Sequence, residues 1–257
     1  YNHSGADLYI DNKLVTELVI PEGVIELPAS SFRGCKSIST VVLPSSLKTI
    51  GEYSFAYTSL KEVTIPSSVE NMYNAFQHCE NLETVTFEEG FKEISDYAFE
   101  YCYALKTINL PSSLERIGSY AFAYCESIEN ITIPSNVNYI EYGAFRECEN
   151  LKDVYIFDLV SWLSIDFNDE ESNPLYLGAN LHINNEAVTK LVIPEGVETI
   201  SEYAFYGCEG LSEVTLSEGV KEIGNYAFYG CKNLTEVSLS STLTNIGSSA
   251  FSRSALT

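Results

Sequence analysis

Hydrophobic and polar positions repeat along almost the whole chain with a period of about 23 residues. The recurring pattern is LxxVxIPxxVxxIxxxAFxxCxxL, and its phenylalanine marks each copy. The markers are Phe32, Phe55, Phe76, Phe99, Phe122, Phe145, Phe205, Phe228 and Phe251. Successive markers lie 23 residues apart, except for one step of 21 and one of 60. A fixed period of this length predicts a stack of similar coils, each too small to bury a core by itself.

The VxI segment of each copy alternates as a half-buried strand does. We therefore expect Val63 and Ile65 to face inward and Thr64 to face solvent. Proline follows this segment directly, at a place where its missing N–H no longer interrupts a sheet. Six of the eight prolines take this place: Pro21, Pro44, Pro66, Pro111, Pro134 and Pro194. The second half of a copy spaces its apolar residues as in a short helix or 3₁₀ turn that packs inward.

A longer similarity divides the chain. Residues 5–24 and 178–197 are identical at 14 of 20 positions. Each of these stretches is predicted to begin with a β-hairpin, whose turn is Asp11-Asn12 in the first and Asn184-Asn185 in the second.

The stretch before the second hairpin leaves the repeat pattern. Its segment DLVSWL predicts a short helix capped by Asp158, followed by an acidic loop. The sequence thus predicts an α/β repeat solenoid in which two arrays are joined by a helix-hairpin insertion. Residues 1–156 hold a hairpin cap and the first array, 157–187 hold the inserted helix, acidic loop and hairpin, and 188–257 hold a second array that is truncated at its C-terminus.

The repeat resembles a known family. Its period lies in the range of leucine-rich repeats, and IPxxVxxIGxxAFxxCxxL is similar to the BspA-type leucine-rich repeats of bacterial and protozoan surface proteins. The resemblance covers nearly the whole chain, including the non-repeating stretch WLSIDF…NPLYLGANLHIN. Members are typically secreted or surface-anchored, and some take part in adhesion to host proteins or other bacteria. The resemblance implies a secreted or cell-surface location and a non-catalytic binding role without a cofactor.

Composition narrows the set of partners. The 257 residues include 14 Lys and Arg against 36 Asp and Glu, a net charge of −22. Nucleic acid and anionic membranes require a basic surface that this chain cannot assemble. Apolar runs are too short to span a bilayer. The chain begins at Tyr1, with neither an initiator Met nor a signal-like segment, so we expect a trimmed fragment of a larger protein, and a monomer.

The cysteines share one register, three residues after the marker phenylalanine. They are Cys35, Cys79, Cys102, Cys125, Cys148, Cys208 and Cys231. Metal binding or redox work needs clustered or mixed ligands, whereas one register predicts small apolar side chains lining the core. We expect free, buried thiols.

Histidines and acidic residues offer weak candidates for chemistry. The histidines occupy unrelated positions and show no nucleophile arrangement: His3, His78 and His182. The acidic loop gathers oxygen ligands that suit calcium: Asp166, Asp169, Glu170 and Glu171. Its spacing lacks the D-x-D-x-D-G rhythm, so we favour a solvated loop and expect no metal site.

Tyrosine is abundant, with 18 copies. Five of them lie two residues before the marker phenylalanine: Tyr53, Tyr97, Tyr120, Tyr203 and Tyr226. Stacked in one register, they predict a ladder of rings that packs coil on coil. Aromatic rows also suit sugar faces and protein hot spots, but we favour the structural interpretation.

The outward positions of the strands are the best candidate surface. Stacked repeats present such positions as one concave sheet, which solenoids commonly use for binding. The candidate ligand-binding residues are Thr64, Thr86, Asn109, Asn130, Thr132, Asp153 and Tyr155. The expected partner is a protein or a glycan. The alternatives are a structural spacer and a carbohydrate-active enzyme on a stacked-coil scaffold; the enzyme requires charged residues that break the register on consecutive coils, and the arrays contain none.

Overall fold

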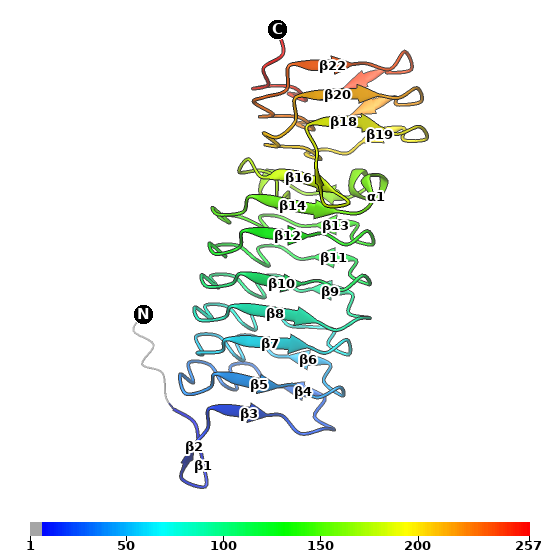
Figure 1. Cartoon of the computed structure of the whole chain (residues 1–257). Coiled ribbons are helices and arrows are strands. Elements are labelled where there is room, and N and C mark those ends of the chain that lie inside the picture. The colour runs from blue at the N-terminus through cyan, green and yellow to red at the C-terminus, as the bar shows by residue number, and fades with distance from the viewer. Residues whose placement is uncertain (1–6) are drawn as a thin grey trace. The chain divides into compact units, whose positions relative to one another are not determined.

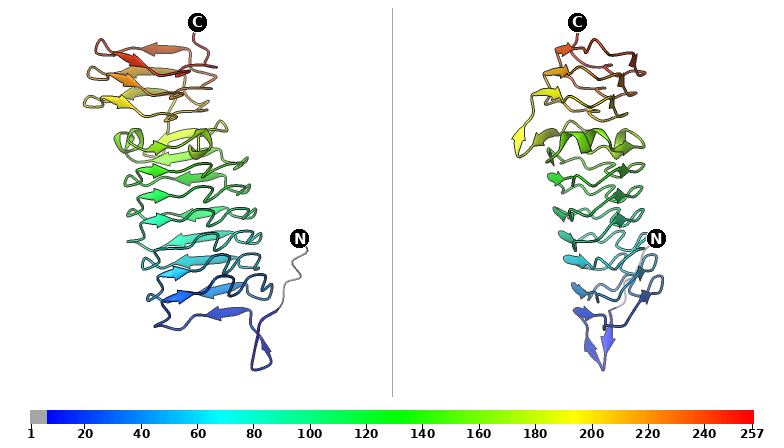
Figure 2. Two further views of the ribbon diagram at one scale, coloured as in Figure 1. Left: turned by 180° about the vertical axis from the view of Figure 1, so that it is seen from behind. Right: turned by 90° about the vertical axis from the view of Figure 1, so that its right-hand side faces the viewer.

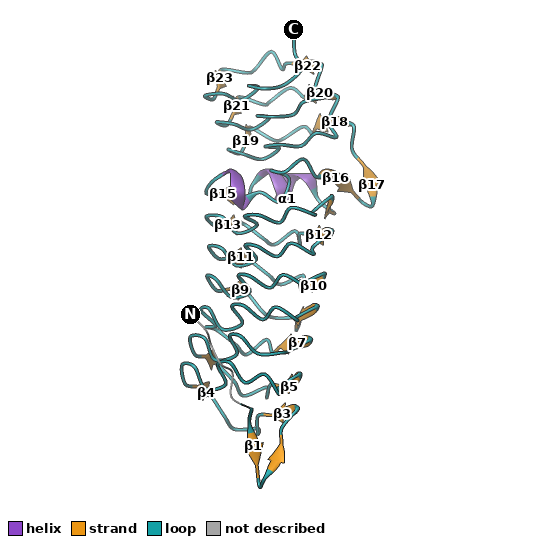
Figure 3. Cartoon of the chain, turned by 90° about the vertical axis from the view of Figure 1, so that its left-hand side faces the viewer, coloured by secondary structure: helices purple, strands orange, loops and turns teal. Residues whose placement is uncertain are grey.

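The computed structural model describes residues 7–257, which form a β-solenoid of about 10 coils (Figure 1). The chain divides into two compact units. The first unit comprises Tyr1–Ile128 and Gly143–Asn150, and the second comprises Glu129–Tyr142 and Leu151–Thr257. Within each unit most coils contribute a strand to one sheet and a shorter strand to another, and turns make up most of the rest (Figures 2 and 3).

The first unit contains a five-stranded parallel sheet with strand order β10-β8-β7-β5-β3. Its strands are β3 (Glu17–Val19), β5 (Thr40–Val42), β7 (Glu62–Ile65), β8 (Thr84–Phe87) and β10 (Thr107–Asn109). Short strands on the other side of the coils also pair in parallel, β4 with β6 and β9 with β11. They are β4 (Glu26–Leu27), β6 (Thr49–Ile50), β9 (Glu93–Ile94) and β11 (Arg116–Ile117). An antiparallel hairpin precedes the sheet, formed by β1 (Tyr9–Ile10) and β2 (Lys13–Leu14).

In the second unit the longer strands, on one side of the coils, form two sheets. One has β12 (Asn130–Thr132), β14 (Asp153–Ile156) and β16 (Asn180–Ile183) in parallel, with β17 (Glu186–Ala187) antiparallel to β16. The other has β18 (Lys190–Ile193), β20 (Glu213–Leu216) and β22 (Glu236–Ser238). The opposite side of these coils carries the short strands β13 (Tyr139–Ile140), β15 (Asp166–Phe167), β19 (Thr199–Ile200), β21 (Glu222–Ile223) and β23 (Asn245–Ile246).

The stretch predicted as an insertion belongs to the coils. Its strand β15 pairs with β13 and its strand β16 pairs with β14, both in parallel. The helix α1 (Leu159–Leu163) lies between β14 and β15 in the chain, and the Asp158 carboxylate accepts the backbone N–H groups of Val160 and Ser161. Trp162 is buried and its indole N–H donates to the carbonyl of Ala204 at 2.9 Å. The irregular sequence therefore builds an enlarged coil, which contains α1 and leads into the antiparallel hairpin of β16 and β17.

The second half of each repeat is not helical, so the α/β class was wrong in its helical part. Tyr97 and Tyr101 have φ values of 56° and 61°, which a right-handed helix does not accept. The N–H groups of Tyr97, Phe99 and Tyr101 donate to carbonyls of the following coil at 2.8 to 2.9 Å. Alternate N–H groups, such as that of Cys102, close local turns instead. Within residues 7–257 regular helix is limited to α1 and the 3₁₀ turn η1 (Glu170–Ser172).

The core follows the predicted alternation. Val63 and Ile65 are buried while Thr64 is exposed. In the first unit the marker phenylalanines stack face to face from Phe32 to Phe145, with ring centroids 5.3 to 5.9 Å apart. This column fills the interior of the coils, because offset-stacked rings combine large apolar area with favourable ring geometry.

All seven cysteines are free thiols, and six of them are buried. The Cys102 thiol donates to the carbonyl of Phe76 at 3.3 Å, and Cys125 makes the same contact with Phe99. Burial raises the pKa of Cys79 and Cys208 to about 11 and that of Cys148 to about 12. The cysteine column therefore lines the core as predicted, with Cys35 half-buried as the exception.

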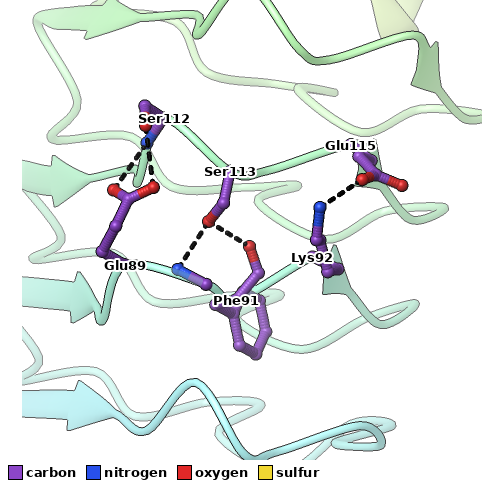
Figure 4. Close-up of polar contacts among 7 residues, drawn as sticks. Glu89, Phe91, Lys92, Ser112, Ser113 and Glu115 are labelled. Atoms are coloured by element: carbon purple, nitrogen blue, oxygen red, sulfur yellow. Dashed lines mark hydrogen bonds and ion pairs between the residues drawn. The ribbon is translucent and has the colours of Figure 1, made fainter.

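Turns at the ends of the strands join neighbouring coils through a glutamate and two serines (Figure 4). The Glu89 carboxylate accepts the backbone N–H of Ser112 at 3.1 Å and its hydroxyl at 2.7 Å. The Ser113 hydroxyl accepts the N–H of Gly90 and donates to the carbonyl of Phe91, both at 2.8 Å. Lys92 and Glu115 add an ion pair. We call this arrangement the coil clamp; Glu22 with Ser45 and Glu218 with Ser241 repeat its carboxylate contacts.

Candidate functional site on the strand face

Three of the predicted site residues lie side by side in the first unit. Thr64 on β7 is in register with Thr86 on β8, which is in register with Asn109 on β10. The Asn109 amide donates to the Thr86 hydroxyl at 3.0 Å. These side chains form a polar row that faces away from the core.

A hollow of about 420 Å³ lies beside this row on the same sheet. Glu17, Thr40 and Glu62 line it from β3, β5 and β7, together with Val42 and Thr64. The side chain of Val42 is 50% exposed. The hollow therefore combines an apolar patch with two carboxylates, which suits a partner carrying both apolar and cationic groups.

The other four predicted residues lie together in the second unit. Asn130 and Thr132 on β12 are in register with Asp153 and Tyr155 on β14. Asn130 and Thr132 are exposed, whereas Asp153 and Tyr155 are half-buried. The predicted set is thus divided into two clusters, one in each unit.

Sequence reasoning missed two residues of this second cluster, Asn180 and His182. Both lie on β16, in register with Asp153 and Tyr155. Nε2 of His182 lies 2.7 Å from Oδ1 of Asp153, and the Asn180 amide donates to the same oxygen at 3.3 Å. The imidazole stacks on the Tyr155 ring with centroids 4.5 Å apart. We call Asn130, Thr132, Asp153, Tyr155, Asn180 and His182 the β14 cluster.

His182 therefore has an acidic partner, Asp153, which was not identified from the sequence. The alternation of Asn180-Leu-His-Ile matches Asp153-Val-Tyr-Ile, and this match was the available signal. It was hidden because the segment was assigned to a hairpin outside the repeats. The His78 ring has a structural role, since it stacks between the rings of Tyr57 and Tyr101, with centroids 4.6 and 4.4 Å away. His3 lies outside the described residues.

The Asp153–His182 pair can orient a ring and a hydrogen-bond donor. Nucleophilic catalysis would need a third group, a serine or cysteine activated by the imidazole. The remaining members of the β14 cluster are amides, a threonine and a tyrosine, which bind and position ligands through hydrogen bonds and ring contacts.

The acidic loop has a structural use. The Asp169 carboxylate accepts the N–H of Ser172 at 2.7 Å and caps η1. Across residues 7–257 no three His, Cys, Asp or Glu side chains converge as metal ligands would. Nor does any helix in that range have the length and apolarity to cross a bilayer.

The predicted tyrosine ladder is present for four of its five members, whereas the Tyr53 ring contacts the Arg33 guanidinium instead. Tyr97 stacks on Tyr120 with centroids 5.1 Å apart, and Tyr203 stacks on Tyr226 at 5.4 Å. A second ladder, which was not predicted, lies two residues after the marker phenylalanine of the first unit. It joins Tyr57, His78, Tyr101 and Tyr124.

Parallel strands repeated every coil, a column of inward apolar residues and an outward polar face define a leucine-rich repeat solenoid. The family model of the BspA type leucine rich repeat region matches residues 7–74, 72–167 and 176–257. The chain therefore belongs to the BspA-type leucine-rich repeat family.

Solved structures include similar proteins. A leucine-rich repeat protein from Bacteroides ovatus is 25% identical, with a TM-score of 0.50, over 93% of this chain and 76% of that one. A leucine-rich repeat protein of T. pallidum is 26% identical, with a TM-score of 0.44, over 85% and 78%. A leucine-rich cell surface protein from Faecalibacterium prausnitzii is 22% identical, with a TM-score of 0.34, over 87% and 79%. No match was found among curated proteins.

Proposed function

We propose that this chain is a non-catalytic binding module of a secreted or cell-surface bacterial protein, and that its strand face contacts a protein or glycan. The observation that carries the proposal is the β14 cluster. Three neighbouring strands hold an aromatic ring, an imidazole, a carboxylate and amides in register on one face. The chain's membership of the BspA-type family, some of whose members are adhesive surface proteins, supports a binding role at the cell surface.

The cluster is ordered before any partner arrives. His182 is held by Asp153 and by the Tyr155 ring, and these three residues are fixed by the parallel pairing of β14 and β16. Preorganised side chains lose little conformational freedom on binding, which lowers the entropic cost of association. Tyrosine is also among the residues enriched at binding hot spots.

The hollow beside Thr64 and Thr86 supports a second contact region in the first unit. Its two carboxylates, Glu17 and Glu62, favour cationic groups on a partner. The chain's net charge of −22 also favours a positively charged partner. A structural spacer is the alternative function, since a stack of coils holds its ends apart whether or not its surface binds anything.

The experiment is a binding screen of the whole chain against arrays of host extracellular proteins and of glycans. A variant carrying Tyr155→Ala and His182→Ala is compared with Thr215→Ala, which removes an outward hydroxyl from β20 of the same unit. We expect the double variant to lose roughly tenfold or more in affinity for the captured partner, and the control to bind as the unaltered chain does. Equal binding of both variants would overturn the role of the β14 cluster, and absence of any captured partner would support the spacer.

A further inference from the structure

A hollow of about 240 Å³ lies on the turn side of the second unit, away from the strands. Three tyrosines, two glycines and an arginine from successive coils line most of it: Tyr176, Tyr206, Tyr229, Gly207, Gly230 and Arg253. The strand-face proposal does not involve this hollow or any of these residues.

The hollow exists because the second unit shifts its aromatic residues by one position. In the first unit the place two residues after the marker phenylalanine holds stacked rings, as in Tyr101 and Tyr124, whose centroids are 4.6 Å apart. In the second unit this place holds Gly207 and Gly230, and the rings move one residue earlier. The ladder of side chains is missing there, and backbone forms the floor in its place.

Glycine is required at Gly207. A Cβ atom on this residue would lie 2.5 Å from the carbonyl oxygen of Tyr176, and its φ is 73°. Gly230 is different, because a Cβ there would meet its nearest atom, a backbone atom of Gly207, at 3.7 Å. The space above Gly230 is therefore open to a side chain or a ligand.

Aromatic rings and positive charge surround this floor. Tyr206 and Tyr229 stack with centroids 4.9 Å apart, and the Arg253 guanidinium lies 5.3 Å from the Tyr229 centroid. Lys232 and Glu209 form an ion pair of 2.5 Å at the edge. Two cations and one carboxylate line the hollow, and the Glu170 carboxylate is close enough to act on Tyr206. Lys232 is paired with Glu209, whereas Arg253 forms no ion pair within residues 7–257. The Arg253 guanidinium is therefore the group that can receive an anionic ligand.

We propose that the hollow binds a single sugar unit that carries a carboxylate. Tyrosine rings pack against the C–H faces of sugars, and arginine binds a carboxylate through two parallel hydrogen bonds. Pockets for drug-sized ligands span roughly 300–1,000 Å³, so the smaller volume here suits one ring rather than an oligosaccharide. The phenol hydroxyl of Tyr206 is a hydrogen-bond donor and acceptor suited to sugar oxygens.

The test is calorimetric titration of the whole chain with sialyllactose, with lactose as the neutral match. We expect sialyllactose to bind and lactose to bind at least roughly tenfold more weakly, the scale of one charged hydrogen-bonded contact. Gly230→Tyr introduces the residue type found at the equivalent positions Tyr101 and Tyr124. Tyrosine adopts a φ of about 60° there, so the backbone conformation at Gly230 is one that tyrosine already takes in this fold. The new ring is expected to fill the hollow.

Gly230→Tyr is expected to abolish sialyllactose binding, whereas Ser238→Tyr, which adds the same ring to the outward face of β22, leaves it unchanged. Arg253→Gln is expected to bring sialyllactose down to the affinity of lactose, and Arg253→Lys to retain part of the difference. Absence of sialyllactose binding to the unaltered chain, or equal binding by the Gly230→Tyr variant, overturns the proposal. The strand-face double variant binds sialyllactose normally if the two sites are independent.

Discussion

Nε2 of His182 and Oδ1 of Asp153 lie 2.7 Å apart across two adjacent strands. The pair links a regular coil to the enlarged coil, since β14 and β16 are 27 residues apart in register rather than 23. Their side chains are 15% and 33% exposed, respectively, so solvent screens the interaction and its contribution to stability is small.

Asp153→Ala is therefore expected to lower the free energy of unfolding by about 1 kcal/mol or less, while freeing the His182 ring to rotate. Urea denaturation measures the first effect, and the imidazole resonances in an NMR spectrum report the second. A loss of several kcal/mol would show that the pair supports the fold rather than the surface.

Phe99→Ala is expected to destabilise the first unit by about 3–5 kcal/mol, because it leaves a cavity between two stacked rings. Phe76 and Phe122 lie on either side of Phe99 with centroids 5.3 and 5.7 Å away. Tyr103→Ala is the control, since that ring is 37% exposed. Denaturant titration followed by circular dichroism measures both variants; a similar small loss in each would contradict the phenylalanine column as the centre of the core.

Thiol reactivity gives a direct test of the cysteine column. In the native protein we expect a thiol reagent at neutral pH to modify Cys35 and to spare the six buried cysteines, whose thiolates are disfavoured by burial. In denaturant all seven become reactive. Mass spectrometry after alkylation counts the labels, and rapid labelling of Cys102 or Cys125 in the folded chain would contradict their burial.

The same burial predicts a loss of stability at alkaline pH. The unfolded thiols begin to ionise near their ordinary pKa of 9.0, whereas Cys79 and Cys208 keep their protons to about 11 and Cys148 to about 12. The unfolded state therefore binds fewer protons across this window, so their contribution is complete below pH 9 and falls as the pH rises through the folded pKa values. Thermal unfolding of the chain and of a Cys148→Ala variant at pH 8 to 11 measures the difference; equal slopes would refute the thiol contribution.

The coil clamp predicts a loss of folding stability at acidic pH. Hydrogen bonds from Ser112 hold the pKa of Glu89 below its usual 4.5, and those from Ser241 do the same for Glu218. The stability they contribute is present above pH 4.5 and is lost as the pH falls through the lowered values. Replacing both with Gln should make the acid side of the melting curve less steep, measured from pH 6 to pH 3.

Glu195→Gln is the matched control for the clamp. Glu195 occupies the same turn of its coil, but the following coil has Glu218-Gly219 at the two positions where Ser112-Ser113 follow Glu89. This variant is expected to melt with the same pH dependence as the unaltered chain. An equal change in the double variant and in Glu195→Gln would mean that general surface charge, and not the clamp, sets the pH dependence on the acid side.

Much of the coil was predictable because its signals are local and repeated. The alternation of Val63, Thr64 and Ile65 directs two of the three side chains into the core, and this does not depend on the sequence of the neighbouring coils. The helical reading failed because the left-handed backbone of Tyr97 and Tyr101 is stabilised by bonds to the next coil, and no pattern of apolar spacing within a single copy records such bonds. His182 was missed for a related reason, since its partner depends on strand register across an irregular coil.

The alternating N–H groups of the turns have a mechanical consequence. Tyr97, Phe99 and Tyr101 direct these groups to the adjacent coil, so a coil detached from its neighbour loses both its left-handed turns and the bonds that compensate for them. Under a pulling force the chain is therefore expected to unfold one whole coil at a time, and each step is expected to release about the same length of chain.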